Sequence, residues 1–236
     1  MKTGIMQPYF FPYIGYFSLI KNVDLFILLD EVQFIRHGWI ERNRILKPRE
    51  GWQYISIPLK KHSQKTLIKD IEINNTSEWR QKIFGQLTHY AKAPFYRETV
   101  QLLTEILDQD FLTITQLDQR SLEMVCQYLN IKTPIQIFSQ MNLEIEKVTA
   151  PDEWALNICK VLPNVTEYWN PPGGKAFFDT KKYSENQINI QFIQMNEIVY
   201  QQGRRTGFEP GLSIIDVLMY NPKEKVLDFL DQYSIL

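Results

Sequence analysis

Cysteine is scarce in this 236-residue sequence, and two other common signals are missing from it. The two cysteines, Cys126 and Cys159, lie in helical patterns among apolar neighbours, and neither belongs to a CxxC or Cys/His group. This excludes a disulfide framework and a zinc cluster, so we expect buried thiols in a reducing compartment. No apolar run approaches the roughly 20 residues that span a bilayer, and the N-terminus lacks a secretory signal pattern. These features predict a cytoplasmic protein.

An excess of charge of one sign is also missing. Lys and Arg number 26 and Asp and Glu 27, so the formal net charge is −1. Because no long-range field draws the protein to nucleic acid or to a membrane surface, we expect neither as a partner. No GxGxxG or GxxxxGK[ST] motif assigns a nucleotide. No acidic cluster demands a metal ion, and the cofactor and the oligomeric state stay open.

Apolar and periodic segments alternate along most of the chain. The pattern predicts strands at 4–7, 24–30, 135–138, 167–169 and 188–193. It predicts helices at 13–22, 152–162, 213–220 and 223–233. Strands separated by helices favour an α/β fold, with a Rossmann-like, mainly parallel sheet and layered helices.

The middle of the chain departs from this alternation. Residues 36–50 are polar and basic, and 53–59 and 68–73 alternate polar and apolar residues as half-buried strands of a hairpin-like excursion do. The pattern is helical from 77 to 129, with Ser77 as the expected N-cap. We therefore expect one domain over 1–236, with 77–129 as an insertion or cap.

An aromatic segment broken by two prolines, Met6 to Phe17, is the most unusual part of the sequence. Pro8 and Pro12 fix the backbone where a strand hands over to a helix, which is where ligands bind in open α/β sheets. Gln7 offers two donors and an acceptor, and Tyr9 and Tyr13 offer rings and hydroxyls for a sugar or base. An aromatic-rich core loop is the alternative interpretation.

Two side chains after the second predicted strand are candidates for proton transfer. Asp30 follows a strongly apolar strand, so its carboxylate emerges at the sheet edge expected for catalysis. His37 is the other candidate, because imidazole is the usual general base near neutral pH. We rank Asp30 above His37.

Arginines follow these residues at close spacing. Arg42 and Arg44 bracket Asn43, and two guanidinium groups so placed can clamp a phosphate or carboxylate. The alternative is surface ion pairing with Glu41 or Glu50.

Two further groups of candidates lie in the second half of the chain. Gly173 and Gly174 follow a predicted strand and permit close approach of the backbone to an anion; a plain turn is the alternative. Tyr200, Ser213 and Asp216 could form a wall of a site. Ser213 and Asp216 also fit the N-cap and first turn of a helix, and capping would by itself explain both.

The segments MQPYFFPYIGYFSLI, DLFILLDEVQF, GWIERNRI, YWNPPGG and FEPGLSIIDVL together resemble the WbqC-like family of bacterial proteins. They occur in the family's order from the N-terminus to about residue 220. The resemblance strengthens a set of candidate site residues in the second segment and the third: Asp30, Gln33, Gly38, Trp39, Arg42, Asn43 and Arg44. At the glycine loop this chain departs from the family pattern, with Asn170 and Pro171 in the first two places.

The family is named from O-antigen polysaccharide clusters, so the resemblance implies an enzyme acting on activated or amino sugars. We expect a transferase whose substrate is a small sugar linked to a nucleotide or carrier. Two alternatives remain. One is an ATP-using nucleotidylyltransferase-like or ligase-like enzyme in which Tyr13 and Tyr16 replace the histidines of an H-x-G-H motif. The other is a non-catalytic carbohydrate-binding module.

Overall fold

A six-stranded sheet forms the centre of the fold in the computed structural model, which describes residues 1–203 and 207–236. Its first five strands are parallel and the last is antiparallel. In sheet order they are β5 (Ile135–Ile137), β2 (Leu25–Leu28), β1 (Lys2–Met6), β6 (Glu167–Asn170), β7 (Asn189–Met195) and β8 (Tyr233–Ile235). The predicted α/β class with a mainly parallel sheet is confirmed.

The order of the strands reverses beside β1. The two strands that follow it in this sheet, β2 and β5, lie on one side, whereas β6, β7 and β8 lie on the other. The carboxyl ends of β1 and β6 therefore flank the crevice in which ligands bind in open α/β sheets.

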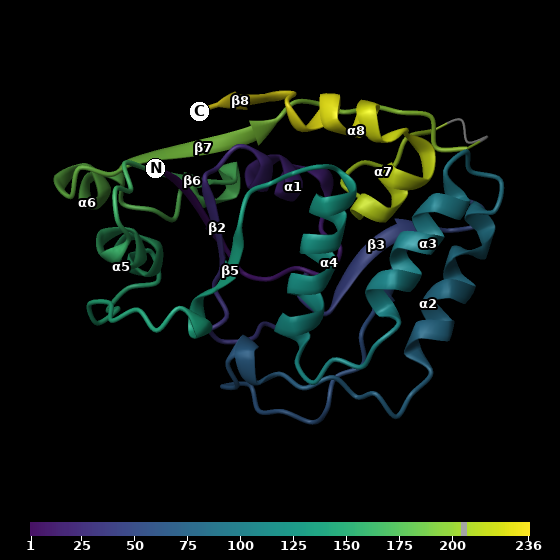
Figure 1. The fold of residues 1–236 in the computed structure, drawn as a ribbon, viewed down its shortest axis with the longest axis horizontal. Coiled ribbons are helices and arrows are strands. Elements are labelled where there is room, and N and C mark those ends of the chain that lie inside the picture. Colours follow the sequence, from purple (N-terminus) through teal and green to yellow (C-terminus); the bar gives the residue numbers. More distant parts are fainter. Residues whose placement is uncertain (204–206) are drawn as a thin grey trace.

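Helices cover both faces of this sheet (Figure 1). One face packs on α5 (Glu153–Val161) and α6 (Thr180–Glu185), in a core that includes Ile5 and Ile27. The other packs on α1 (Ile14–Lys21), α7 (Ile214–Tyr220) and α8 (Lys223–Leu230).

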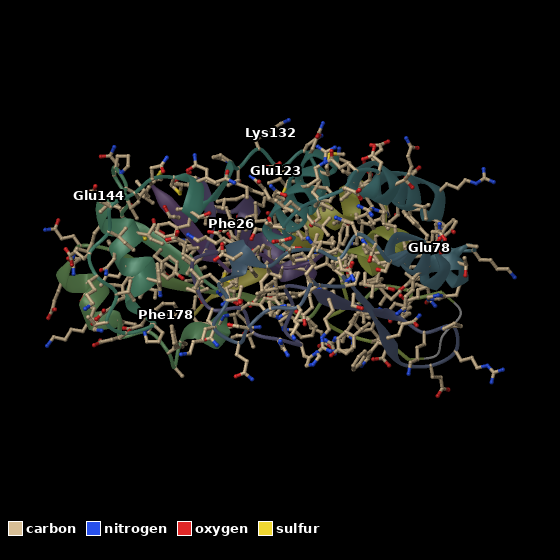
Figure 2. All side chains as sticks on the ribbon, turned by 90° about the horizontal axis from the view of Figure 1, so that it is seen from below. Phe26, Glu78, Glu123, Lys132, Glu144 and Phe178 are labelled. Atoms are coloured by element: carbon tan, nitrogen blue, oxygen red, sulfur yellow. The ribbon has the colours of Figure 1, made fainter. Side chains whose placement is uncertain are left out.

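Alternation along the central strands supplies both cores. Leu25 and Ile27 face α5, while Phe26 and Leu28 face α1, as the two-residue period of a strand requires. Phe26 is fully buried and lies near the middle of the molecule, whereas Lys132 and Glu144 lie toward its outline (Figure 2). A Cβ atom at Gly4 would lie 2.9 Å from the Phe26 ring, so the absence of a side chain there allows this packing.

The predicted helical segment 77–129 forms three helices: α2 (Trp79–Leu87), α3 (Tyr96–Leu107) and α4 (Ile114–Tyr128). Helix α3 packs against both α4 and α7, and α4 leads the chain back to β5. Four short 3-10 turns complete the described elements: η1 (Ile68–Asp70), η2 (Thr88–Tyr90), η3 (Phe138–Gln140) and η4 (Pro172–Gly174).

The predicted hairpin of 53–59 with 68–73 is wrong. The observed hairpin pairs β3 (Arg42–Leu46) with β4 (Trp52–Ser56), and 68–70 is the turn η1. Only the isolated bridge Leu59–Ile73 joins the two predicted strands. The apolar residues of 68–73 are buried by tertiary packing, which imitates strand alternation in the sequence. The sequence pattern did not predict the strand at 42–46, because it carries two arginines and a buried asparagine.

Two predicted N-caps have opposite outcomes. The Ser213 hydroxyl accepts from Ile215 N at 3.2 Å and caps α7 as expected. Ser77 does not cap α2, whose N-cap is Glu78; the Ser77 hydroxyl donates to Asn74 O at 3.4 Å instead.

Residues 1–203 and 207–236 contain neither a membrane-spanning helix nor a cluster of metal-binding side chains. None of the helices there combines the length and apolar character of a membrane span, and no three Asp, Glu, His or Cys side chains gather as a metal site.

Candidate functional site

The loop 7–13 starts at the crevice beside β1 and brings several predicted site residues together. Gln7 directly follows β1, and the Asn170 amide at the end of β6 lies 3.8 Å from the Met6 sulfur. The Gln7 carbonyl accepts from the Tyr16 hydroxyl at 2.8 Å. The position of the loop is thus fixed where the strand order reverses, which is the place predicted for ligand binding.

Phe11 adopts a strained conformation in the middle of this loop. Its φ of 40° lies in the left-handed region, which aromatic side chains rarely occupy. The buried Phe11 carbonyl accepts from Asn43 Nδ2 at 3.0 Å and from the Ser213 hydroxyl at 2.7 Å. Asn43 also donates to the Phe10 carbonyl at 3.0 Å. Asn43 and Ser213 are at most 3% exposed, and their hydrogen bonds hold the loop in shape. Their role in substrate binding stays a prediction.

Tyr9 and Tyr13 are half-buried beside each other. Burial raises the pKa of both hydroxyls, and for Tyr9 the nearby Tyr13 adds to the effect. Both therefore stay protonated donors at neutral pH. The Tyr13 ring covers Gly15, where a Cβ atom would lie only 2.4 Å from the ring. Tyr16 is buried, and its ring packs 5.5 Å from that of Tyr9.

The two arginines of β3 extend from the same side of the strand, with Asn43 on the other. The Arg42 guanidinium lies 4.0 Å from the centre of the Tyr54 ring. The Arg44 guanidinium lies 5.4 Å from the Trp39 ring and 5.1 Å from the Trp52 ring. This arrangement, which we call the arginine pair, orients both cations on aromatic surfaces.

The arginine pair lacks acidic partners. Within the described part of the chain neither guanidinium forms a salt bridge, so the alternative of pairing with Glu41 or Glu50 is wrong. Arg42 donates to His37 O and Arg44 donates to Gly211 O at 3.0 Å. The Nε atom of each is buried without a hydrogen-bond partner among these residues. Two neighbouring, half-buried guanidinium groups without acidic partners among these residues suit an anion.

His37 lies beside this pair. Its φ is 61°, its side chain is exposed, and its backbone N–H donates to Glu41 Oε1 at 2.5 Å. Its carbonyl accepts from Arg42, so the backbone of His37 lies against the arginine pair.

Asp30 is held away from solvent, with 1% of its surface exposed. Its two carboxylate oxygens accept from the Ser139 backbone N–H at 3.0 Å and the Ser139 hydroxyl at 2.7 Å. Burial raises the Asp30 pKa, and the two bonds from Ser139 oppose that rise. This contact ties the end of β2 to the end of β5. The assignment of Asp30 as a catalytic base stays a prediction.

Gln33 and Trp39 occupy different surroundings. The Gln33 amide donates to Gln64 O at 2.6 Å, so it joins two outer loops. Trp39 is 40% exposed, and its carbonyl accepts from Phe10 N at 2.9 Å. Trp39 thus links the aromatic loop to the arginine pair, whereas the Gln33 side chain contacts neither through a hydrogen bond within the described chain.

The two glycines of η4 differ in their surroundings. A Cβ atom at Gly174 would lie 2.4 Å from Asn170 Oδ1 and 2.8 Å from the Phe178 ring. At Gly173 it would meet nothing within 4 Å. Asn170 itself is 8% exposed and donates to the Tyr168 hydroxyl at 2.5 Å. Only Gly173 therefore offers open backbone to a ligand.

Asp216 is the centre of a buried hydrogen-bond network. Its carboxylate accepts from the Tyr90 hydroxyl at 2.7 Å, the Tyr200 hydroxyl at 2.6 Å and Gln202 Nε2 at 3.0 Å. The Tyr90 hydroxyl in turn accepts from Leu46 N at 2.8 Å, at the end of β3. Burial, and secondarily the charge of Asp216, raises the pKa of both tyrosines. Tyr200 and Asp216 thus join α7 to the arginine-bearing hairpin.

Residues that the sequence did not single out complete the arrangement. Ser139, Tyr90 and Trp52 contact predicted site residues from distant parts of the chain. No local sequence pattern identified these three residues as part of the site, because each contacts a partner more than five residues away in the sequence. The loop 7–13 carries Gln7, Tyr9 and Tyr13, and Asn43 bonds it to the strand that carries the arginine pair. Asp30 instead bonds to Ser139, beyond β5. That these side chains form a single site stays a prediction.

The chain was then compared with known proteins. A model of the WbqC-like protein family matches residues 7–227. The chain belongs to the WbqC-like family. It is 29% identical over 237 aligned residues, 97% of each chain, to "Uncharacterized protein Rv1507c" of Mycobacterium tuberculosis. No solved structure matches. The residues from Gln7 to Asp216 that build the site all lie inside the matched range of this WbqC-like chain.

Proposed function

We propose that the protein is a transferase that acts on an activated sugar or amino sugar, linked through phosphate to a nucleotide or carrier, in bacterial surface polysaccharide biosynthesis. The observation that carries this proposal is the arginine pair: two cations without acidic partners, oriented by three aromatic rings beside the aromatic loop. Planar guanidinium groups bind phosphate oxygens bidentately.

The sugar would lie along the loop 7–13. Half-buried Tyr9 and Tyr13 offer ring surface and protonated hydroxyls, and Gln7 offers an amide at the crevice. Aromatic rings with polar edges are suited to the mixed apolar and hydroxyl surfaces of a sugar.

Transfer would proceed by direct displacement. The bond between the sugar and its phosphate breaks as an acceptor hydroxyl or amine attacks, and His37 takes the acceptor's proton. Negative charge develops on the leaving phosphate, and Arg42 and Arg44 stabilise it. His37 takes the role of proton acceptor in place of Asp30 because it is exposed, whereas Asp30 is buried and both its oxygens bond to Ser139.

The nucleotidylyltransferase-like alternative has less support. It requires Tyr16 to replace a phosphate-binding histidine, but Tyr16 is 1% exposed and its hydroxyl is bonded to the Gln7 carbonyl. A carbohydrate-binding module without catalysis would use the same residues, so turnover has to be measured separately from binding.

The test is a thermal-shift screen of the full chain against nucleotide-sugars, with Arg42→Ala and an exposed control, Arg97→Ala on α3. A ligand at 100 times its dissociation constant stabilises by roughly 2.7 kcal/mol, which is several degrees here. We expect a shift that Arg42→Ala abolishes and Arg97→Ala retains. A shift that is equal in both variants, or a shift with ATP alone, would contradict the proposal.

Turnover is followed by release of the nucleotide or carrier phosphate from the donor that binds. We expect His37→Asn to bind the donor normally and to transfer more slowly by about 100-fold or more, the usual contribution of a general base. Donor binding without release in the presence of hydroxyl and amine acceptors would favour the binding module.

A further inference from the structure

A large cleft opens at the end of the β3–β4 hairpin, beyond the arginine pair. Its volume is about 970 Å³, within the usual range for a small-molecule site. The β3–β4 turn, the connection from η2 to α3, and residues on both sides of the undescribed 204–206 line it. None of the predicted site residues lies in its walls.

The walls of the cleft combine ring surface with positive charge. Phe208 and Tyr220 are half-buried aromatic residues in the lining. The charged lining residues are three cations and two carboxylates: Lys47, Arg49, Lys92, Glu50 and Glu209. Arg49 and Lys92 are exposed and form no salt bridge with any residue of the described chain. Aromatic rings for stacking and positive charges in the same cleft suit a nucleobase that carries phosphate.

The buried network of Asp216 fixes the shape of the cleft. Gln202 lies in the wall, and it donates both to Asp216 and to Glu209 O at 3.0 Å. Glu209 N donates back to Gln202 Oε1 at 2.8 Å. Tyr90 connects the same network to Leu46, another lining residue. The walls are therefore organised before a ligand arrives.

The cleft begins at the end of the strand that carries the arginine pair. Leu46 follows Arg44 by two residues on β3, about 7 Å along the strand at roughly 3.4 Å per residue. The segment that carries Glu209 continues to Gly211, whose carbonyl accepts from Arg44 at 3.0 Å. A diphosphate on the arginines would place an attached nucleoside within reach of the cleft.

We infer that this cleft holds the nucleoside of a nucleotide-linked sugar whose diphosphate lies on Arg42 and Arg44. The inference rests on the proposed function and narrows its substrate from nucleotide- or carrier-linked sugars to the nucleotide-linked class. Phe208 and Tyr220 pack against the base and ribose, while Arg49 and Lys92 are the exposed cations of the lining.

The test uses isothermal titration of the full chain with pyrophosphate and with the diphosphates of uridine, adenosine, guanosine and thymidine. Gly207 lines the cleft, and an added Cβ would meet no atom of the described residues within 4 Å, so Gly207→Trp adds a large ring to the lining without removing a packed side chain. Gly85→Trp on α2 is the matched control, since its Cβ also meets nothing within 4 Å and Gly85 is outside the lining. Phe208→Ala removes a wall ring, and circular dichroism checks its folding.

We expect one nucleoside diphosphate to bind roughly tenfold or more tightly than pyrophosphate, the gain that stacking of one base supplies. Gly207→Trp and Phe208→Ala should remove this gain and leave pyrophosphate binding unchanged, while Gly85→Trp keeps both. Equal affinity for pyrophosphate and every nucleoside diphosphate would overturn the inference, as would a gain that survives Gly207→Trp.

The outcomes separate this inference from the proposed function. Nucleoside diphosphate binding that survives Arg42→Ala but is lost in Gly207→Trp would keep the cleft and reject the role of the arginine pair. Pyrophosphate binding that depends on Arg42, without any gain in affinity from a nucleoside, would support the arginine pair as the phosphate site and reject the cleft as the nucleoside site. Failure of every probe to bind would overturn both.

Discussion

At the scale of single residues, the family motifs act largely by shaping the backbone. Asn43 and Ser213 converge on the carbonyl of Phe11, a residue held at a φ of 40°. Such conformations persist only where surrounding contacts fix them, and they concentrate at functional sites. These hydrogen bonds hold the loop that carries Tyr9 and Tyr13 against the strand that carries the arginine pair.

We expect Ser213→Ala to lower the free energy of unfolding by about 1–3 kcal/mol, because a buried carbonyl and the α7 cap both lose a partner. Asn43→Ala should have a similar effect, and the double variant should lose less than the sum, since both side chains bind the same carbonyl. Urea unfolding measures each value. Ser184→Ala, at an exposed serine, is the control. If the loss of unfolding free energy in the double variant equals the sum of the two single losses, Asn43 and Ser213 do not stabilise the Phe11 carbonyl jointly.

Asp118 on α4 provides a second prediction at this scale. It is fully buried, and neither carboxyl oxygen has a hydrogen-bond partner among the described residues. Burial, and secondarily the charge of Glu41, raises its pKa well above the usual value of 3.8. The folded state thus holds this proton more tightly than the unfolded chain. The contribution of Asp118 to stability is greatest below pH 3.8 and falls as the pH rises toward the folded-state pKa.

We therefore expect Asp118→Asn to raise the free energy of unfolding at pH 7 by about 1–3 kcal/mol, with the difference shrinking at pH 4. Urea unfolding at the two pH values measures this, with Asp228→Asn on the exposed side of α8 as the control. A variant that is less stable than the parent at pH 7 would show that Asp118 has a stabilising cationic partner.

At the scale of elements, short loops at strand ends decide what the sheet edge can bind. The loop after β6 is tight at Gly174 and open at Gly173. Likewise β3 orients Arg42 and Arg44 alike only because it is a strand, with residues two apart on one side.

The two glycines of this loop give a matched pair of variants. Gly174→Ala forces a Cβ against Asn170 and Phe178, so we expect a loss of about 1–3 kcal/mol in stability. Gly173→Ala enters open space and should change stability by less than about 0.5 kcal/mol. Thermal unfolding of both proteins measures the difference. Equal effects would mean that the loop moves as freely at Gly174 as at Gly173.

At the scale of the whole molecule, the sheet separates two cores, and each contains one cysteine. Cys126 lies in the core that includes α1 and α4, and Cys159 in the core beneath α5. Burial raises the pKa of each thiol to about 12, and Glu123 adds to the effect at Cys126. The thiols therefore report on the opening of each core separately.

We expect both thiols to resist modification by an aromatic disulfide reagent in the native protein, at pH 7 and also at pH 9, because the thiolate is the reactive form. Both should react promptly in denaturant. Cys126→Ser and Cys159→Ser identify which core opens first at intermediate urea. Rapid labelling of native protein at pH 7 would contradict the burial that we describe.

The order of elements was predictable from the sequence over most of the chain, and residues 36–73 were the exception. Central strands such as β2 are apolar on both faces, and helices such as α3 repeat at their own period, so local pattern and tertiary environment agree. In 36–73 they disagree. There the guanidinium groups of Arg42 and Arg44 pack on aromatic rings of the partner strand β4. The isoleucines of 68–73 are buried although this segment is not a strand.

The sequence by itself determined the α/β class, the family and most of the side chains that carry polar chemistry, because these depend on local periodicity and on residue type. Only the tertiary structure decided which of them are buried and which stay exposed. Asn43, Ser213 and Asp216 became internal supports, and the arginine pair remained without acidic partners in the described chain. The reason is physical: exposure and hydrogen-bond partners are set by segments far apart in the chain, such as Phe11 and Ser213, which no local pattern relates.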